Sequence, residues 1–99
     1  MKVYLQVLKF VFDSLRDGHK SVSSPVIRSS LNILSPTLYT TLRMLRIKKL
    51  LVGSKDMFYP RRKAWSITRE GIHYLRIKGV ISEEEMKEGF KLIEETSFW

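Results

Sequence analysis

The sequence predicts a mainly α domain with a small β-hairpin, which is an α+β fold class. Apolar residues recur at helical spacing in five stretches, and Ser, Thr, Pro or Gly residues stand at the ends of these stretches. Two short apolar runs, Leu50–Val52 and Ala64–Ile67, enclose a segment that contains Gly53 and Pro60. Such turn formers between two β-like runs indicate a hairpin with a long tip. At 99 residues and 43% hydrophobic content, the chain is expected to form one domain with a modest core.

The N-terminal helix, predicted within residues 1–17, is apolar over much of its circumference. One stripe holds Leu5, Leu8, Phe12 and Leu15, and a second stripe beside it holds Tyr4, Val7 and Val11. A helix of this kind needs burial on more than one side. Two interpretations stay open: a central core helix, or a helix that also packs against a second subunit. Gly18 suits the left-handed residue that follows a helix.

Two capped helices are predicted in residues 24–49. Ser24 is expected to cap the second helix with Pro25 at its first position, and Ser35 and Pro36 repeat this start signal for the third helix. The third helix is predicted to turn three leucines toward the core: Leu38, Leu42 and Leu45. Because only a short turn joins them, the two helices are interpreted as a helix-turn-helix unit.

The hairpin, residues 50–67, precedes two more helices. Thr68 is expected to cap the fourth helix, residues 68–79. Ser82 followed by three glutamates is the pattern of a capping box, and it opens the last helix, residues 82–97. Acids in a first helical turn are favoured by the helix dipole.

The third helix also carries residues expected to contact a nucleic acid. Its positions outside the core stripe include Ser35, Thr37, Tyr39, Thr40, Thr41 and Arg43. Threonines are poor helix formers, and their hydroxyls can bond to phosphates or to base edges. The alternative is a polar surface that the helix merely tolerates.

Positive charge gathers in the same part of the chain. Ser35–Gly71 holds nine Lys and Arg against two Asp and Glu, which is +7 of the chain's formal net charge of +8. Four of these cations stand at the end of the third helix: Arg43, Arg46, Lys48 and Lys49. Four more surround the hairpin tip: Lys55, Arg61, Arg62 and Lys63. Cations so placed would add affinity and salt sensitivity on a nucleic-acid backbone. A solvated loop with a chance charge run is the alternative for the tip.

Three segments resemble PadR-like winged helix-turn-helix regulators. Ser35–Leu45 resembles their recognition helix, Leu50–Val52 their first wing strand, and Arg61–Gly71 their wing exit, in which an aromatic residue and a Thr-x-x-Gly helix start follow a basic tip. MarR-like and small archaeal or archaeal-virus winged-helix proteins are similar. The resemblance implies a single winged-helix domain over residues 1–99 that forms a homodimer through its terminal helices. The dimerisation candidates are Leu5, Leu8, Phe12, Phe90 and Ile93.

Three features depart from the PadR-like pattern. Lys49 stands where a glycine usually precedes the first wing strand, so that turn must differ or use Gly53 instead. Trp65 occupies the wing position where the family commonly has tyrosine. The last helix is single and short, which leaves the dimer geometry open.

The main hypothesis is a homodimeric, sequence-specific transcriptional regulator that binds double-stranded DNA. The third helix would enter the major groove, and Arg61 and Arg62 would lie against the backbone or in the minor groove. A pI near 10 agrees with an anionic partner. One rival is a winged-helix module that binds protein and not DNA. Another is attachment to an anionic membrane, which a hairpin-centred charge fits poorly.

No cluster of side chains indicates an enzyme. Asp13 and Asp17 accompany no nucleophile, His19 and His73 lack metal-ligand spacing, and the chain has no cysteine. We therefore expect no catalytic residue, no metal and no cofactor. A cytoplasmic location is expected because no secretory signal or membrane span is evident. The operator, the sign of regulation and any small-molecule effector stay open.

Overall fold

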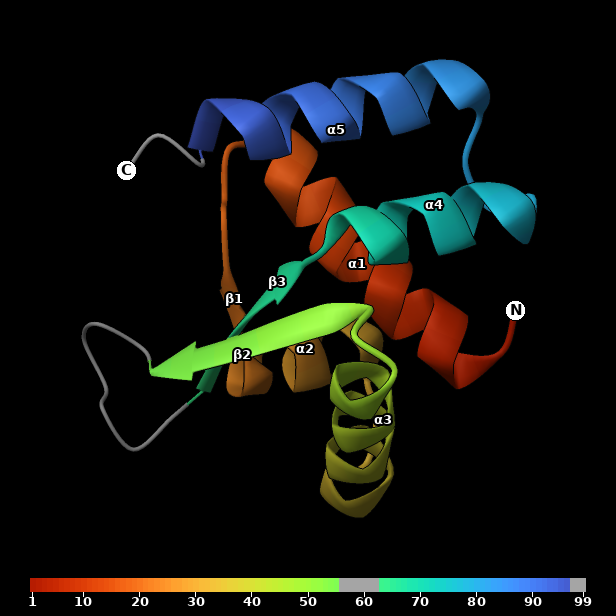
Figure 1. Ribbon diagram of the computed structural model, residues 1–99. Coiled ribbons are helices and arrows are strands. Elements are labelled where there is room, and N and C mark those ends of the chain that lie inside the picture. The colour runs from red at the N-terminus through yellow and green to blue at the C-terminus, as the bar shows by residue number, and fades with distance from the viewer. Residues whose placement is uncertain (56–62, 97–99) are drawn as a thin grey trace.

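The computed structural model describes residues 1–55 and 63–96 (Figure 1). Five helices and three strands are found in these residues. In chain order they are α1 (Val3–Arg16), β1 (Val22–Ser23), α2 (Ser24–Leu31), α3 (Ser35–Ile47), β2 (Leu51–Lys55), β3 (Lys63–Ile67), α4 (Arg69–Ile77) and α5 (Glu83–Thr96). The predicted fold class, mainly α with a small hairpin, is confirmed.

β3 is the middle strand of a three-stranded antiparallel sheet with the order β1-β3-β2. β2 and β3 form the predicted hairpin, in which Leu51 lies opposite Ile67 and Gly53 lies opposite Trp65. The sequence pattern does not predict β1, which pairs Val22 with Trp65. A strand of two residues is too short to display an alternating pattern, so only its tertiary pairing reveals it.

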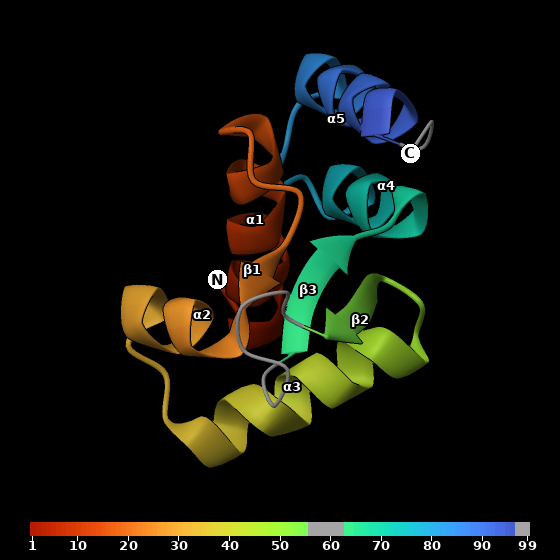
Figure 2. The same cartoon turned by 90° about the vertical axis from the view of Figure 1, so that its left-hand side faces the viewer.

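α1 is the central helix of the core. It contacts β3 and each of the other four helices (Figures 1 and 2). Val7, Leu8 and Phe12 have no exposed surface at all, 0% each. One chain therefore covers most of both apolar stripes by itself, and only Tyr4 and Leu5, near the N-terminus of the helix, stay partly exposed. This corrects the assignment of Leu8 and Phe12 to a dimer interface, because their own chain encloses both side chains completely.

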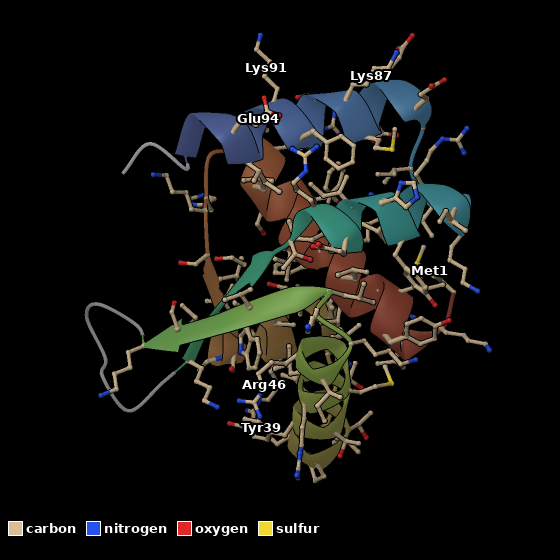
Figure 3. All side chains as sticks on the ribbon, viewed as in Figure 1. Met1, Tyr39, Arg46, Lys87, Lys91 and Glu94 are labelled. Carbon is tan, nitrogen blue, oxygen red and sulfur yellow. The ribbon has the colours of Figure 1, made fainter. Side chains whose placement is uncertain are left out.

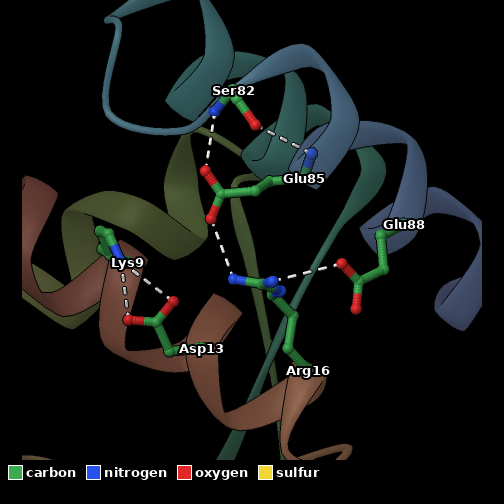
Figure 4. A network of polar contacts seen from close by, with 6 residues as sticks. All are labelled: Lys9, Asp13, Arg16, Ser82, Glu85 and Glu88. Carbon is green, nitrogen blue, oxygen red and sulfur yellow. Dashed lines mark hydrogen bonds and ion pairs between the residues drawn. The ribbon is translucent and has the colours of Figure 1, made fainter.

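α5 lies against α1 and α4, at the end of the molecule opposite α3 (Figure 2). Gly89 allows this close approach, since a Cβ there would stand 2.6 Å from Cε2 of Phe12. The guanidinium of Arg16 on α1 forms ion pairs with Glu85 at 2.9 Å and Glu88 at 3.2 Å (Figure 4). Apolar packing at Gly89 and the two ion pairs of Arg16 together hold α5 on the core.

Two of the predicted helix caps are confirmed. The Thr68 hydroxyl accepts a hydrogen bond from the Gly71 amide at 3.0 Å. Ser82 and Glu85 form a reciprocal capping box, in which each backbone amide donates to the other residue's side chain, at 3.0 and 3.1 Å (Figure 4). These local signals act within one turn, so the sequence predicts them reliably.

The predicted caps at Ser24 and Ser35 are wrong. Both serines lie inside their helices, and the residue before each one is the N-cap and makes no side-chain capping bond. The Ser24 hydroxyl instead accepts a hydrogen bond from Trp65 Nε1 at 2.8 Å, and the Ser35 hydroxyl accepts one from Arg28 Nη1 at 2.7 Å. Partners from other elements thus bind the serine oxygens that a local pattern assigns to capping.

The turn after α3 keeps its usual form although it has no glycine. Lys49 itself adopts the left-handed conformation with φ 63°. The amide of Leu50 then donates to the carbonyl of Leu45 at 2.9 Å, which closes the helix end. Gly53 takes no part, because it lies within β2. The expectation that the turn must differ or use Gly53 is therefore wrong.

Within the described residues, no helix is both long and apolar enough to cross a membrane.

Candidate nucleic-acid interface

α3 is anchored by one face and presents the others outward. Leu38, Leu42 and Leu45 are at most 1% exposed, which confirms the predicted core stripe. The helix projects at the end of the molecule away from α5 (Figures 1 and 2). Its remaining sides divide into a leading end near its N-terminus and a flank that faces the hairpin.

The leading end of α3 carries exposed Pro36, Thr37 and Thr40, with Thr41 half-buried beside them. The hydroxyl of Thr40 donates to the carbonyl of Pro36 at 2.9 Å, and that of Thr41 donates to the carbonyl of Thr37 at 2.8 Å. A hydroxyl has a single hydrogen, so in this conformation both side chains can only accept further hydrogen bonds. Phosphate oxygens are acceptors, and these two hydroxyls are therefore suited to base amino groups and not to phosphates.

Arg28 positions the start of α3. Its Nη1 donates to the Ser35 hydroxyl at 2.7 Å, across the turn between α2 and α3. Asn32, in the left-handed conformation with φ 52°, ends α2 in the same turn. Ser35 is half-buried in this contact, so the structure shows it bracing the turn. A direct contact of Ser35 with DNA stays a prediction.

A cleft of about 390 Å³ lies on the hairpin flank of α3. Three cations line it, Arg43 and Arg46 from α3 and Lys63 from β3, together with Tyr39 and Trp65. Figure 3 shows Tyr39 and Arg46 on the same side of the helix. No carboxylate is among the described residues that line this cleft, and none of the ion pairs between described residues involves its cations. The cleft is therefore suited to an anion.

Trp65 forms the rigid wall of the cleft. It is 4% exposed, and its Nε1 donates to the Ser24 hydroxyl at 2.8 Å. Gly53 on the neighbouring strand accommodates the ring, because a Cβ there would stand 3.1 Å from Cζ3 of Trp65. The Lys63 ammonium lies 5.9 Å from the ring centroid. Trp65 thus joins the hairpin to α2 at the cleft.

Two lysines face each other where the described part of the hairpin ends. Lys55 and Lys63 are direct cross-strand partners, and both are exposed. Like charges opposite each other destabilise a strand pair. A bound anion would relieve this repulsion. The predicted contacts Arg61 and Arg62 lie outside the described residues.

Lys48 lies at the other end of α3 from the leading threonines. Its charge is one of those that lower the pKa of Tyr4 near the N-terminus of α1, after the main cause, a hydrogen bond with Tyr74. Of the four cations expected together at the end of this helix, Arg43 and Arg46 line the cleft, whereas Lys48 and Lys49 do not. The spacing of three residues on one helix is the sequence signal that links the two arginines.

Leu34 is an exposed residue of this surface that the sequence pattern does not predict. It directly precedes α3 and is 78% exposed, although leucine is usually buried. Ile33, its neighbour, packs against the core. Two consecutive apolar residues beside a turn give no signal as to which one points inward.

Of the predicted dimerisation residues, Leu5, Phe90 and Ile93 are partly buried against the core of their own chain. The Phe90 ring also lies 4.7 Å from the guanidinium of Arg69, which pairs with Glu94 at 3.1 Å. These three side chains keep some exposed surface, unlike Leu8 and Phe12. Elsewhere, no group of three His, Cys, Asp or Glu in the described part of the chain could hold a metal ion.

No protein-family model matches the sequence, and no curated protein matches it either. Solved structures match nearly its whole length. A mutant of S. aureus MepR bound to an oligodeoxyribonucleotide has a TM-score of 0.61 and 26% identity, over 99% of this chain and 64% of that one. S. aureus MepR in its DNA-binding conformation has a TM-score of 0.62 and 25% identity, with coverages of 99% and 64%. PcaV, a transcriptional regulator from Streptomyces coelicolor seen with its natural ligand, has a TM-score of 0.63 and 15% identity, with coverages of 98% and 74%.

This chain spans less than two thirds of the length of these MepR chains. None of the three neighbours bears on the PadR-like subtype, which stays a prediction. The structural match to MepR and PcaV extends over the five helices and the three-stranded sheet of the described residues. The chain therefore has the winged helix-turn-helix fold of MarR-like regulators.

Proposed function

We propose that this protein is a sequence-specific transcriptional regulator that binds double-stranded DNA. α3 enters the major groove, and the hairpin lies against the adjacent backbone or minor groove. The observation that carries the proposal is the division of α3 into a polar leading end and a cation-lined flank. The first suits base edges and the second suits phosphates. The MepR structures, one of them bound to an oligodeoxyribonucleotide, support the same role for this fold.

The protein is proposed to act in the cytoplasm as a homodimer. Leu5, Phe90 and Ile93 are the dimerisation candidates that retain exposed surface. A two-fold dimer implies a pseudo-palindromic operator with half-sites about one helical turn, roughly 34 Å, apart. The PadR-like subtype rests on the motifs of Ser35–Gly71 alone.

The proposal is tested by the salt dependence of duplex binding. Fluorescence anisotropy measures binding to a labelled duplex pool at salt concentrations from about 50 to about 200 mM. Over about this range, the affinity of a protein that contacts phosphates falls strongly. The double variant Arg43→Ala with Arg46→Ala is expected to bind every duplex more weakly. Its slope of log affinity against log salt should fall by about 2, since each lost phosphate contact lowers it by about 1.

The matched control removes two cations at the opposite end of the molecule. Lys87 and Lys91 on α5 point away from the body (Figure 3). The double variant Lys87→Gln with Lys91→Gln loses the same charge and should keep the wild-type slope. Equal slopes for both double variants, or binding indifferent to salt, would contradict the proposed surface. A stable protein complex without any duplex affinity would favour the protein-binding module instead.

A further inference from the structure

The leading end of α3 has a chemistry of its own, distinct from the cationic flank. Leu34 and Pro36 expose apolar atoms there, and Thr37 and Thr40 expose short side chains that each end in a methyl and a hydroxyl. No charged side chain belongs to Leu34–Thr41. In a helix-turn-helix, this N-terminal part of the second helix contacts base edges. The following inference rests on the proposed function and concerns which bases these residues prefer.

The hydroxyl of Thr40 can act toward DNA only as a hydrogen-bond acceptor. Its hydrogen is donated to the Pro36 carbonyl at 2.9 Å, so the exposed part of the group is an acceptor. In the major groove, adenine and cytosine present amino hydrogens, whereas guanine presents only acceptors at N7 and O6. Thr40 therefore matches adenine or cytosine and does not match guanine.

Leu34 supplies the apolar half of the surface. Its carbonyl accepts a hydrogen bond from the Leu38 amide at 3.0 Å, which fixes its backbone at the start of α3. Its side chain is nevertheless 78% exposed. The only apolar group on the major-groove edge of the four bases is the C5 methyl of thymine. An exposed leucine directly before a helix that exposes threonine methyls is complementary to this group.

One kind of base pair offers a partner for both the hydroxyl acceptor and the apolar groups of this surface. An A·T pair offers the adenine amino group as donor and the thymine methyl as apolar contact on the same edge, whereas a G·C pair offers a donor without the methyl. We propose that the leading end of α3 recognises A·T pairs. The Thr40 hydroxyl accepts from the adenine amino group, and the methyl of Thr40 and the side chain of Leu34 contact thymine methyls. Arg43 and Arg46, which line the cleft, contribute affinity that is the same for all sequences.

The test combines protein variants with base analogues. Bound duplexes are first selected from a random pool with the full-length wild-type protein. Deoxyuridine then replaces each thymine in turn, which removes only the methyl, and deoxynebularine replaces each adenine, which removes only the amino group. At the recognised pair, wild-type affinity should fall about fourfold for the lost methyl contact. It should fall about two- to tenfold for the lost hydrogen bond.

Two variants of Thr40 separate the two contacts. Thr40→Ser keeps the hydroxyl and should lose only the sensitivity to deoxyuridine, whereas Thr40→Val keeps the shape and should lose only the sensitivity to deoxynebularine. Leu34→Ala should reduce sensitivity to deoxyuridine at a neighbouring position. Leu34 and Thr40 are both exposed, so each variant is expected to fold. Far-ultraviolet circular dichroism checks this.

The outcomes distinguish this inference from the proposed function. Selected sites with G·C pairs in place of A·T, or wild-type binding unaffected by deoxyuridine, would overturn the A·T preference alone. Salt-dependent binding to all sequences alike would also overturn it, while leaving DNA binding intact. Failure to bind any duplex at low salt would overturn both.

Discussion

The hydrogen bond between Trp65 and Ser24 offers a direct measure of what holds the hairpin to the helix-turn-helix unit. Ser24 is 6% exposed and Trp65 is 4% exposed, and their bond is 2.8 Å long. In Ser24→Ala the indole N–H stays buried with its acceptor removed. A buried donor without a partner costs about 1–3 kcal/mol of stability. For a domain of this size, each 1 kcal/mol lowers Tm by about 5 °C.

Urea unfolding followed by circular dichroism measures this loss as a lower midpoint at an unchanged slope. The matched control is Ser30→Ala, an exposed serine on the same helix, which should gain up to about 0.5 kcal/mol because alanine is the better helix former. A cycle with Trp65→Phe isolates the pair, and its coupling energy should be about 0.5–3 kcal/mol, the usual range for residues in contact. Equal midpoints for Ser24→Ala and Ser30→Ala would refute the reasoning.

Three further predictions concern the helix ends and the packing of α5. Lys49→Gly should raise the free energy of unfolding by about 0.5–1 kcal/mol, because glycine takes the left-handed conformation at φ 63° without the strain that a side chain adds; a lower urea midpoint would contradict this. Gly89→Ala should lower stability by about 1–3 kcal/mol, since its Cβ would stand 2.6 Å from Phe12 Cε2, and an unchanged midpoint would contradict this steric cost. Hydrogen bonds to Ser82, foremost the one from its backbone amide, lower the pKa of Glu85 below its ordinary 4.5. Stability from this group is therefore present above about pH 4.5 and lost as the pH falls through the lower folded pKa, and Glu85→Gln should flatten that part of a pH–stability curve.

Much of the fold is predictable because its signals are local. The leucine spacing in α3, the turn formers between β2 and β3, and the caps at Thr68 and Ser82 each depend on residues within a few positions of one another. The elements predicted from these signals agree with the structure, and so does the placement of Leu38, Leu42 and Leu45 in the core.

The candidate site was harder to predict because its residues meet across the fold. Arg46 and Lys63 line one cleft although they come from a helix and a strand. Ser24 resembles a cap in sequence, yet its oxygen accepts from Trp65, which only the paired hairpin brings within reach. Leu34 and Ile33 are alike in sequence, and packing alone decides which of them is exposed.

By itself the sequence determined the fold class, the order of the five helices and the hairpin, and the concentration of charge in Ser35–Gly71, because periodicity, capping and composition are properties of the chain. Tertiary structure decided that α1 buries Leu8 and Phe12 within one chain, and that Lys49 ends α3 in place of glycine. It also decided how the threonine hydroxyls point and which cations share a cleft. These depend on which surfaces meet when the helices pack, and contacts between distant residues leave no periodic trace in the sequence.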